Sequence, residues 1–320
     1  MKTTSPLGGG ERDSEGPTTS VPILEIASIW KRYGDTVAVQ DLSLEIRAGE
    51  VFGFVGRNGA GKTTTMRIVL GVLSADAGEV RWKGLPLDFA ARRRVGYMPE
   101  ARGLYPKMRL IEQLTYLGGL HGMSDTAARA AGMRWLERFG LAERRDDEVQ
   151  ALSLGNQQRM QLAVALVFDP DILVLDEPFA GLDPVAVDVM SAVLRERADA
   201  GLPVIFSSHE LELVERLCDR VGIIDHGRML ACGTVDELRA GGPERVWVDV
   251  PAAPGDWPGD LAGVSVIARD GTRVLLELGP GSDDQAILDS ARGTGPVKEF
   301  RQAQRSLTEL FRDVVAEGER

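Results

Sequence analysis

The stretch that decides the fold reads Val51-Phe52-Gly53-Phe54-Val55-Gly56-Arg57-Asn58-Gly59-Ala60-Gly61-Lys62-Thr63. Its first five residues form an apolar run of strand length, and after Thr63 the apolar residues recur at helical spacing. Residues Gly56 to Thr63 match the pattern G-x-x-x-x-G-K-[ST], in which a glycine-rich turn joins a strand to a helix. Because both flanking elements are expected here, the pattern predicts a loop that binds the phosphates of a nucleoside triphosphate.

The residue types of this loop suit phosphate binding. Glycine has no Cβ, so the backbone can approach a phosphate closely, and the N–H groups of the turn and of the helix N-terminus present partial positive charge. We expect Lys62 to reach the β- and γ-phosphates and the Thr63 hydroxyl to bind Mg²⁺. The residues assigned to the nucleotide are Gly56, Arg57, Asn58, Gly59, Ala60, Gly61, Lys62, Thr63 and Thr64. The alternative is a glycine-rich turn that binds nothing, and the flanking patterns disfavour it.

Composition limits the classes of partner. The 320 residues carry 37 Lys and Arg against 48 Asp and Glu, a net charge of −11, and an acidic chain is poorly suited to binding nucleic acid. No apolar run approaches the length of a membrane span, and the first residues lack the apolar segment of a secretion signal. We therefore expect a cytoplasmic protein with no nucleic-acid partner. The two cysteines, Cys218 and Cys232, are too few for a disulfide scaffold, so we expect buried, reduced thiols.

Composition and periodicity divide the chain into three parts. Residues 1–22 are rich in Gly, Ser, Thr and Pro and have no apolar period, so we expect a disordered tail. Residues 23–240 carry the loop and its flanking strands, and within them residues 101–160 become helical, charged and rich in alanine. Residues 241–320 mix short strand and helix patterns, so we expect a small separate α/β domain.

The expected elements follow from apolar period and from turn residues. Strands are expected at Ile23–Ile26, before a turn at Lys31–Asp35, and at Val37–Ile46, Gly78–Trp82, Arg94–Met98, Val221–Ile224, Arg228–Leu230, Arg245–Val250, Val264–Ala268, Arg273–Leu278 and Val297–Arg301. Helices are expected at Arg109–Leu120, Thr126–Phe139, Leu152–Phe168, Asp283–Arg292 and Ser306–Val315. The last helix has an apolar stripe, which we assign to the core of the C-terminal domain; a docking site is the alternative.

Two further apolar runs end in residues suited to catalysis. Ile172-Leu173-Val174-Leu175 precedes Asp176 and Glu177, and so continuous a run is typical of a strand buried on both faces of a parallel sheet. Open α/β sheets bind ligands at the carboxyl ends of their strands. We therefore expect Asp176 to bind Mg²⁺ and Glu177 to polarise the attacking water. The run Leu202–Ser208 ends in His209, which the same reasoning places beside the triphosphate.

Together these motifs resemble the nucleotide-binding subunit of ABC (ATP-binding cassette) transporters, over residues 23–240. Gly56–Thr63 is similar to the Walker A loop of that family, and Ile172–Asp176 is similar to its Walker B strand. The resemblance implies that Tyr33 stacks on adenine. It also implies that Glu177 is the catalytic glutamate and His209 the switch histidine.

Two of the motifs that resemble this family concern contacts between two copies of the subunit. Asp183 ends the stretch Ala180–Asp183, which resembles the D-loop at the dimer interface of the family. Leu152-Ser153-Leu154-Gly155-Asn156 resembles the family signature LSGGQ: Ser153 and Gly155 are retained, whereas Leu154 and Asn156 differ from the family's glycine and glutamine. The resemblance implies that Ser153, Gly155 and Asn156 contact the γ-phosphate held by a second copy, in a head-to-tail homodimer. A helix that Ser153 merely caps is the alternative.

A departure from the family lies at Glu100, where the family carries a glutamine. A carboxylate can still bind Mg²⁺ or orient water, but it adds negative charge near the γ-phosphate. The run Pro99–Tyr105 and the C-terminal extension resemble a subgroup of ABC-2 exporter ATPases related to sodium- and antibiotic-export systems.

The resemblance implies an α/β fold: a phosphate-loop NTPase with a RecA-like core, an antiparallel β subdomain and a helical subdomain, followed by a small α/β C-terminal domain. It implies ATP and Mg²⁺ as ligands, a separate transmembrane permease as partner, and a peripheral position on the inner face of the cell membrane. The expected function is ATP hydrolysis that energises export of an ion, a drug or another small molecule. One alternative is a soluble non-transport ABC ATPase acting on ribosome or DNA-repair complexes. The other is a nucleotide kinase or GTPase that shares only the phosphate loop.

Overall fold

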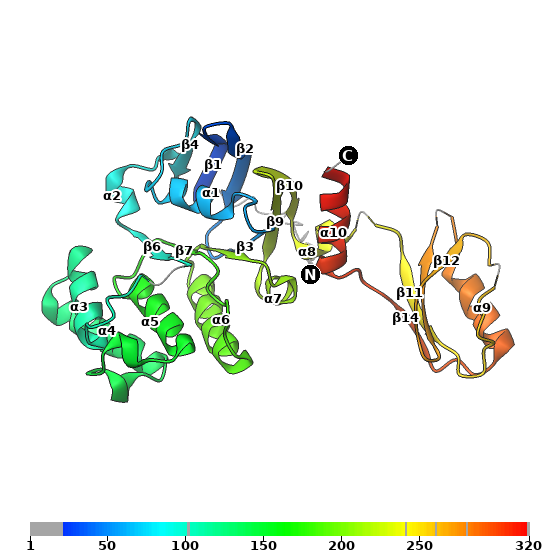
Figure 1. The fold of residues 1–320 in the computed structure, drawn as a ribbon. Coiled ribbons are helices and arrows are strands. Elements are labelled where there is room, and N and C mark those ends of the chain that lie inside the picture. Colours follow the sequence, from blue (N-terminus) through cyan, green and yellow to red (C-terminus); the bar gives the residue numbers. More distant parts are fainter. Residues whose placement is uncertain (1–21, 101–102, 241, 260, 280, 319–320) are drawn as a thin grey trace, which may run out of the picture.

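Three β-sheets organise the chain (Figure 1). The computed structural model describes residues 22–100, 103–240, 242–259, 261–279 and 281–318. The strand orders are β2-β1-β4-β5, β10-β9-β3-β8-β7-β6 and β12-β13-β11-β14. The tail expected at residues 1–22 lies outside the described residues except for its last position. Of the helices that the structure describes, none is both long enough and apolar enough to cross a membrane.

The central sheet of six strands is mostly parallel. Its strands are β3 (Val51–Val55), β6 (Val95–Met98), β7 (Ile172–Leu175), β8 (Val204–Ser208), β9 (Arg220–Asp225) and β10 (Arg228–Gly233), of which only β10 runs antiparallel to its neighbour. Every residue of β3, β7 and β8 is buried, which explains their continuous apolar runs. The carboxyl ends of these three strands lie at one edge of the sheet, so the residues that follow them meet there.

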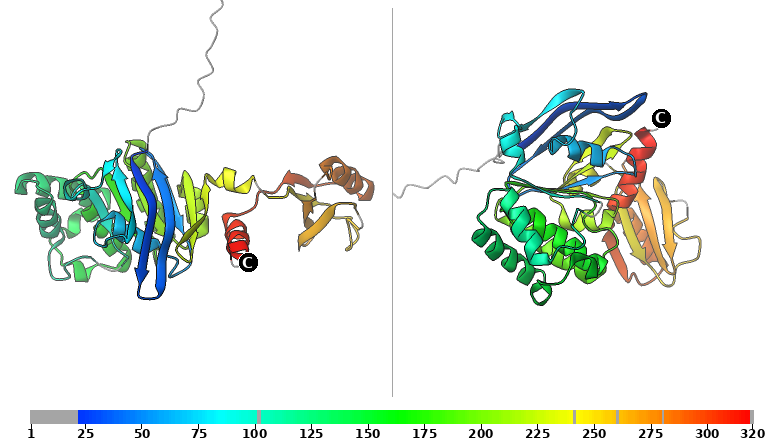
Figure 2. Two further views of the ribbon diagram at one scale, coloured as in Figure 1. Left: turned by 90° about the horizontal axis from the view of Figure 1, so that it is seen from above. Right: turned by 60° about the vertical axis from the view of Figure 1, so that its left-hand side comes forward.

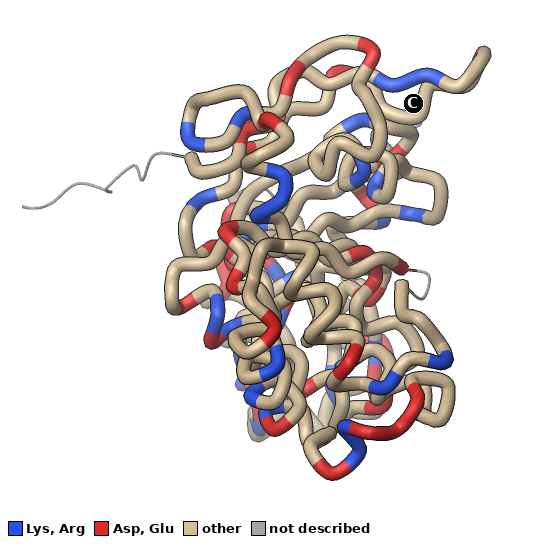
Figure 3. Tube along the Cα trace, turned by 90° about the vertical axis from the view of Figure 1, so that its left-hand side faces the viewer, with Lys and Arg blue, Asp and Glu red and all other residues tan. Residues whose placement is uncertain are grey.

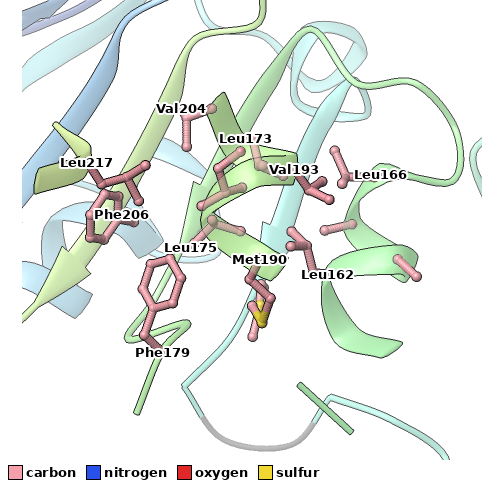
Figure 4. Packing of buried hydrophobic residues seen from close by; sticks show 14 of the residues in the cluster. Leu162, Leu166, Leu173, Leu175, Phe179, Met190, Val193, Val204, Phe206 and Leu217 are labelled. Atoms are coloured by element: carbon pink, nitrogen blue, oxygen red, sulfur yellow. The ribbon is translucent and has the colours of Figure 1, made fainter. Parts of the chain in front are cut away.

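The main apolar core covers one face of this sheet (Figure 4). Leu173 and Leu175 of β7 lie beside Phe206 of β8, and side chains of two helices pack against them. These helices are α5 (Leu154–Leu166) and α6 (Pro184–Asp199). Two shorter helices, α7 (Leu211–Leu217) and α8 (Val235–Arg239), lie toward the β9 and β10 side (Figure 1).

The antiparallel sheet and the helix after the phosphate loop share a second core. The sheet contains β1 (Leu24–Tyr33), β2 (Thr36–Ile46), β4 (Ala77–Trp82) and β5 (Leu85–Pro86), and the helix is α1 (Lys62–Val69). Met66, Ile68 and Val69 of α1 are buried in the cluster that also contains Phe52 and Phe54 of β3. Strand β1 is longer than expected, because it continues to Tyr33 where a turn was predicted. Its register shifts after Ile26, so the alternation that identifies a strand is lost there.

The helical region follows β6 and a short helix, α2 (Phe89–Arg92). It contains α3 (Leu110–Leu120), α4 (Asp125–Arg138) and two short 3₁₀ helices at Ala142–Arg144 and Val149–Ala151, and it continues into α5. The predictions for α3 and α4 are confirmed within one residue at each end. Among the described residues, acidic and basic positions are interspersed on the side that this region presents (Figure 3).

The C-terminal sheet has a core of its own. It consists of β11 (Arg245–Asp249), β12 (Val264–Asp270), β13 (Arg273–Leu278) and β14 (Glu299–Gln302), and α9 (Asp284–Thr294) covers it. Val246, Val248 and Leu276 of the sheet pack with Ile287 and Ala291 of α9. We call the region from β11 to β14 the small unit and the rest of the described chain, including α10, the cassette. The small unit lies at the end of the cassette away from the helical region (Figure 1 and the left view of Figure 2).

The last helix, α10 (Leu307–Gly318), does not belong to that core, which corrects our expectation. Leu307 and Leu310 are buried in the main core of the cassette, and Phe311 and Val314 pack against the same core. The helix contacts α7, α8, β9 and β10. An apolar stripe predicts that one helix face is buried, but the stripe does not specify the surface that buries it.

The prediction of two buried thiols is wrong for Cys232, and Cys218 is partly buried. Both cysteines are free, but Cys232 is exposed, on the outermost strand of the central sheet, where it accepts a hydrogen bond from Arg220 at 3.4 Å. Cys218 lies after α7, and its Sγ is against the backbone of Gly53. Burial raises the pKa of the Cys218 thiol well above its ordinary value.

Candidate nucleotide-binding site

The predicted phosphate loop forms the turn between β3 and α1. Gly61 stands at the N-cap of α1 with φ of 108°, a conformation that L side chains rarely adopt. A Cβ at Gly61 would lie 2.6 Å from the carbonyl oxygen of Ala38 in β2. A Cβ at Gly56 would lie 2.4 Å from the carbonyl oxygen of Ile224. Glycine is therefore required at both positions for the loop to pack against the neighbouring strands.

A pocket at the carboxyl edge of the central sheet gathers most of the predicted site. Its lining consists of Ala38, Arg57, Asn58, Gly59, Ala60, Gly61, Lys62, Thr63, Thr64, Glu100, Asp176 and Glu177. Its volume is about 280 Å³, and residues of the phosphate loop form most of its lining. Tyr33 lies outside this lining, at the end of β1, and its side chain is half exposed. Ala38 also lines the pocket, although no pattern in the sequence points to it.

Lys62 lies at the floor of this pocket. The residue is 6% exposed, and its Nζ donates to the carbonyl oxygens of Gly56 at 2.7 Å and Arg57 at 3.3 Å. The same nitrogen is 3.7 Å from Oε1 of Glu177. The ammonium group is thus fixed between the loop and the end of β7, within a few ångströms of the predicted catalytic carboxylate.

Asp176 is a buried carboxylate directly after β7. It is 1% exposed, and its Oδ1 accepts a hydrogen bond from the Ser207 hydroxyl at 2.7 Å. Within the part of the chain that the structure describes, no Lys, Arg or His forms an ion pair with it. Burying a carboxylate without an opposite charge is costly, so this position suits a bound cation. Burial and the nearby charge of Asp176 raise the pKa of Tyr97.

Glu177 and His209 are brought together by the neighbouring strand ends of β7 and β8. Nδ1 of His209 lies 2.9 Å from Oε2 of Glu177, so the ring nitrogen can donate to the carboxylate. The Glu177 side chain is 11% exposed, whereas that of His209 is 58% exposed. Glu177 has φ of 50°, which is uncommon for a residue other than glycine.

Glu100 follows β6 and lines the same pocket. This position is the one that a ligand of a metal ion in the pocket requires. The Gln161 side chain donates to the carbonyl oxygen of Pro99 at 3.1 Å and so ties the residue before Glu100 to α5. The predicted ligands Thr63, Asp176 and Glu100 therefore surround one space, and their oxygen atoms are the donors that Mg²⁺ prefers.

The signature residues lie elsewhere. Ser153 is the N-cap residue of α5 by backbone conformation, but its side chain is exposed and makes no capping hydrogen bond. Gly155 and Asn156 in the first turn are half-buried, and none of the three lines the phosphate pocket of the same chain. Asp183 does act as a cap, because its carboxylate accepts from the N–H of Ala186 at 2.7 Å and starts α6.

Ser207 is a site residue that sequence reasoning missed. It is fully buried near the end of β8 and contacts both Asp176 and Glu177. The only signal in the sequence is a pair of serines, Ser207 and Ser208, that ends an otherwise apolar strand.

Comparison with known proteins agrees with this geometry. Residues 39–180 match the family described as ABC transporter, and residues 233–315 match the family described as ATP-binding protein DrrA1-3-like, C-terminal domain. The uncharacterized ABC transporter ATP-binding protein YhaQ of Bacillus subtilis (strain 168) is 36% identical over 296 residues, covering 90% of this chain and 97% of that protein.

Other similar proteins cover about two thirds of this chain. Nod factor export ATP-binding protein I of Burkholderia orbicola (strain AU 1054) is 42% identical over 68% of this chain and 73% of its own length. Linearmycin resistance ATP-binding protein LnrL of Bacillus subtilis (strain 168) is 35% identical over 69% and 72%, respectively. A solved structure of an ATP binding subunit of an ABC transporter is 30% identical, with a TM-score of 0.64 over 68% of this chain and 92% of its own. The fold, the site and these matches show that this chain belongs to the ATP-binding subunits of ABC transporters.

Proposed function

We propose that this subunit hydrolyses ATP in the presence of Mg²⁺ and that hydrolysis energises export through a separate transmembrane permease. The observation that carries the proposal is the position of the Glu177 carboxylate. It lies 2.9 Å from Nδ1 of His209 and 3.7 Å from Nζ of Lys62, in the pocket that also contains Asp176. A carboxylate held between an imidazole and an ammonium group, beside a phosphate loop, is placed to take a proton from water.

The residues of the pocket divide the reaction between them. The loop N–H groups and Lys62 bind the β- and γ-phosphates. Thr63, Asp176 and Glu100 would hold Mg²⁺, which neutralises charge on these phosphates. Glu177 accepts a proton from water as the water oxygen bonds to the γ-phosphorus, and the bond from that phosphorus to the bridging oxygen breaks to give ADP and phosphate. His209 orients the Glu177 carboxylate through the bond from Nδ1.

The proposed active form is a head-to-tail homodimer. The Ser153 side chain is exposed and is not used as a helix cap, so its hydroxyl is free to contact a γ-phosphate bound by the second copy. We propose the same role in trans for Gly155 and Asn156, and a place at the dimer interface for the turn that Asp183 ends. Tyr33, half exposed outside the phosphate pocket, is proposed to stack on the adenine.

Export is proposed as the direction of transport. The proteins named for Nod factor export and for linearmycin resistance are similar to this chain over about two thirds of its length, 68% and 69%. The match of residues 233–315 to the DrrA1-3-like C-terminal domain supports the same subgroup. We propose that the subunit acts on the inner face of the membrane, attached to its permease, and that the permease selects the substrate.

Two substitutions test the proposal in the full chain. Lys62→Ala should weaken ATP binding by about 30-fold or more, because it removes a buried charge that pairs with the phosphates. Glu177→Gln should keep ATP binding, lower turnover by about 100-fold or more and accumulate a dimer that light scattering detects. Lys107→Ala and Glu143→Gln are matched controls at exposed positions. Turnover of ATP by Glu177→Gln at the wild-type rate would show that the assigned base is wrong.

A further inference from the structure

Ser207 joins two residues of the proposed catalytic machinery. Strands β7 and β8 pair in parallel with Leu175 opposite Phe206, so the next residues, Asp176 and Ser207, lie side by side at the edge of the sheet. Ser207 has no exposed surface. A buried hydroxyl needs a hydrogen-bond partner. The Ser207 hydroxyl acts both as a donor and as an acceptor, in each case to a residue of the site.

One oxygen atom makes both contacts. Oγ of Ser207 donates to Oδ1 of Asp176 at 2.7 Å and accepts from the backbone N–H of Glu177 at 2.8 Å. The first bond fixes the rotation of a buried carboxylate. The second holds the peptide of a residue whose φ of 50° is unfavourable for a glutamate. The direction of the Asp176 carboxylate and the path of the Glu177 backbone therefore depend on the same hydroxyl.

The adjacent serine shows that burial alone does not produce this arrangement. Ser208 is also buried, at 3% exposure, but its Oγ accepts from the N–H of Glu210 at 3.0 Å, in the turn that leads into α7. The two serines at the end of β8 thus form hydrogen bonds with different segments: Ser207 with the residues after β7, and Ser208 with the turn before α7. Only Ser207 reaches the two acids after β7.

We propose that Ser207 is a positioning residue for ATP hydrolysis, setting the orientation of Asp176 toward the divalent cation and of Glu177 toward water. This inference rests on the proposed function. An alanine at this position would leave the Asp176 oxygen and the Glu177 N–H without their shared partner. Residues that hold metal-binding side chains in place commonly affect metal affinity or activity by about 10- to 100-fold.

The test compares Ser207→Ala, Ser207→Thr and Ser208→Ala in the full chain. Binding of a fluorescent ATP analogue is measured in EDTA, binding of Mn²⁺ to the nucleotide complex is measured by electron paramagnetic resonance, and kcat and KM for ATP are measured with Mg²⁺. For Ser207→Ala we expect metal-free nucleotide affinity within about twofold of wild type, with Mn²⁺ affinity and kcat each about 10-fold lower. KM should change little. Ser207→Thr, which retains a hydroxyl, should recover most of both losses.

Ser208→Ala separates positioning from general loss of a buried hydroxyl. It should lower stability without weakening Mn²⁺ binding. Equal losses of Mn²⁺ affinity in Ser207→Ala and Ser208→Ala, or Mn²⁺ affinity and kcat within twofold of wild type in Ser207→Ala, would overturn the proposal. If Ser207→Ala does not fold, Ser207→Cys replaces it, because a thiol is nearly isosteric but a weak hydrogen-bonding group. A wild-type protein without turnover would contradict the proposed function, while the Mn²⁺ measurement would still judge Ser207.

Discussion

The phosphate pocket and the C-terminal helix α10 are both built onto the central sheet, but by different routes. The pocket uses the phosphate loop after β3 and residues that follow β6 and β7 closely, so parallel pairing among these strands and β8 brings Lys62, Glu100 and Asp176 to one edge. Helix α10 reaches the β9 and β10 side only after the chain has formed the small unit and returned (Figure 1). The first arrangement follows from strand order, whereas the second depends on tertiary contacts between segments far apart in sequence.

The two regions therefore differ in how tightly each position is constrained. In the pocket, single atoms decide the geometry, as the close approaches at Gly56 and Gly61 show. At α10, several apolar side chains together hold the helix in place, and Leu307 and Leu310 are two members of a large core. Substitutions in the pocket should change ligand binding, and substitutions at α10 should change stability.

The largest expected effect is at Gly61. Gly61→Ala places a Cβ 2.6 Å from the Ala38 carbonyl oxygen and adds a side chain at φ of 108°, so the loop has to move. We expect ATP binding to become undetectable in a titration that measures the wild type easily. Gly201→Ala is the matched control, since Gly201 has φ of 100° but no atom within 4 Å of the added Cβ. It should cost only about 1 to 2 kcal/mol of stability. Normal ATP affinity in Gly61→Ala would contradict the role of the close approach.

The second effect distinguishes the two helices of the C-terminal region. Leu310 of α10 is 5% exposed in the main core, and Ile287 of α9 is fully buried in the small unit. Either change to alanine should lower the free energy of unfolding by about 2 to 5 kcal/mol. Leu310→Ala should destabilise the cassette, and Ile287→Ala should destabilise the small unit. In calorimetry, ATP should raise the transition that Leu310→Ala lowers, because ATP binds the cassette. ATP should leave the transition lowered by Ile287→Ala unchanged.

Thiol labelling provides the control for that experiment. Cys218 Sγ is packed against Gly53 of β3, so its modification reports opening of the central sheet. It should react at a lower temperature in Leu310→Ala than in wild type, and at the wild-type temperature in Ile287→Ala. If Cys218 reacted at a lower temperature in Ile287→Ala than in wild type, the cassette and the small unit would have to unfold together.

Much of the pocket was predictable because its signals are local. The phosphate loop is a short pattern between two recognisable elements, and the continuous apolar run of β7 places its two acids at a sheet edge. The pairing of Glu177 with His209 follows once β7 and β8 are neighbours. Ser207 could not be selected in this way, because its function depends on which strand lies next to β8 and not on any pattern within β8.

Outside the pocket, predictions were wrong where the pattern of apolar residues along the chain does not determine the tertiary contacts. Strand β1 was predicted too short because register shifts interrupt its alternation. Helix α10 was predicted at nearly the right residues but assigned to the wrong core, since its apolar stripe carries no information on its partner. Cys232 was expected to be buried because cysteines usually are, but its strand lies at the edge of the sheet.

The smallest expected effect concerns the junction between α7, α8 and α10. Arg239 at the end of α8 forms an ion pair with Glu215 of α7 and donates to the carbonyl oxygen of Arg305 at 2.7 Å. Glu215 also accepts from the backbone N–H of Leu307 at 3.0 Å, at the start of α10. The segments that leave and re-enter the cassette are thus joined to the helix that begins shortly after His209.

Glu215→Gln tests how much this junction contributes. The amide retains an acceptor for the Leu307 N–H but loses the charge that pairs with Arg239, and the pair is partly exposed. We expect a loss of about 1 kcal/mol or less at low ionic strength, shrinking in 1 M salt as the charges are screened. Glu212→Gln, at an exposed position of the same helix, should change stability less than Glu215→Gln at either ionic strength. A loss of several kcal/mol that does not depend on salt would mean that α10 is held by this carboxylate rather than by its apolar face.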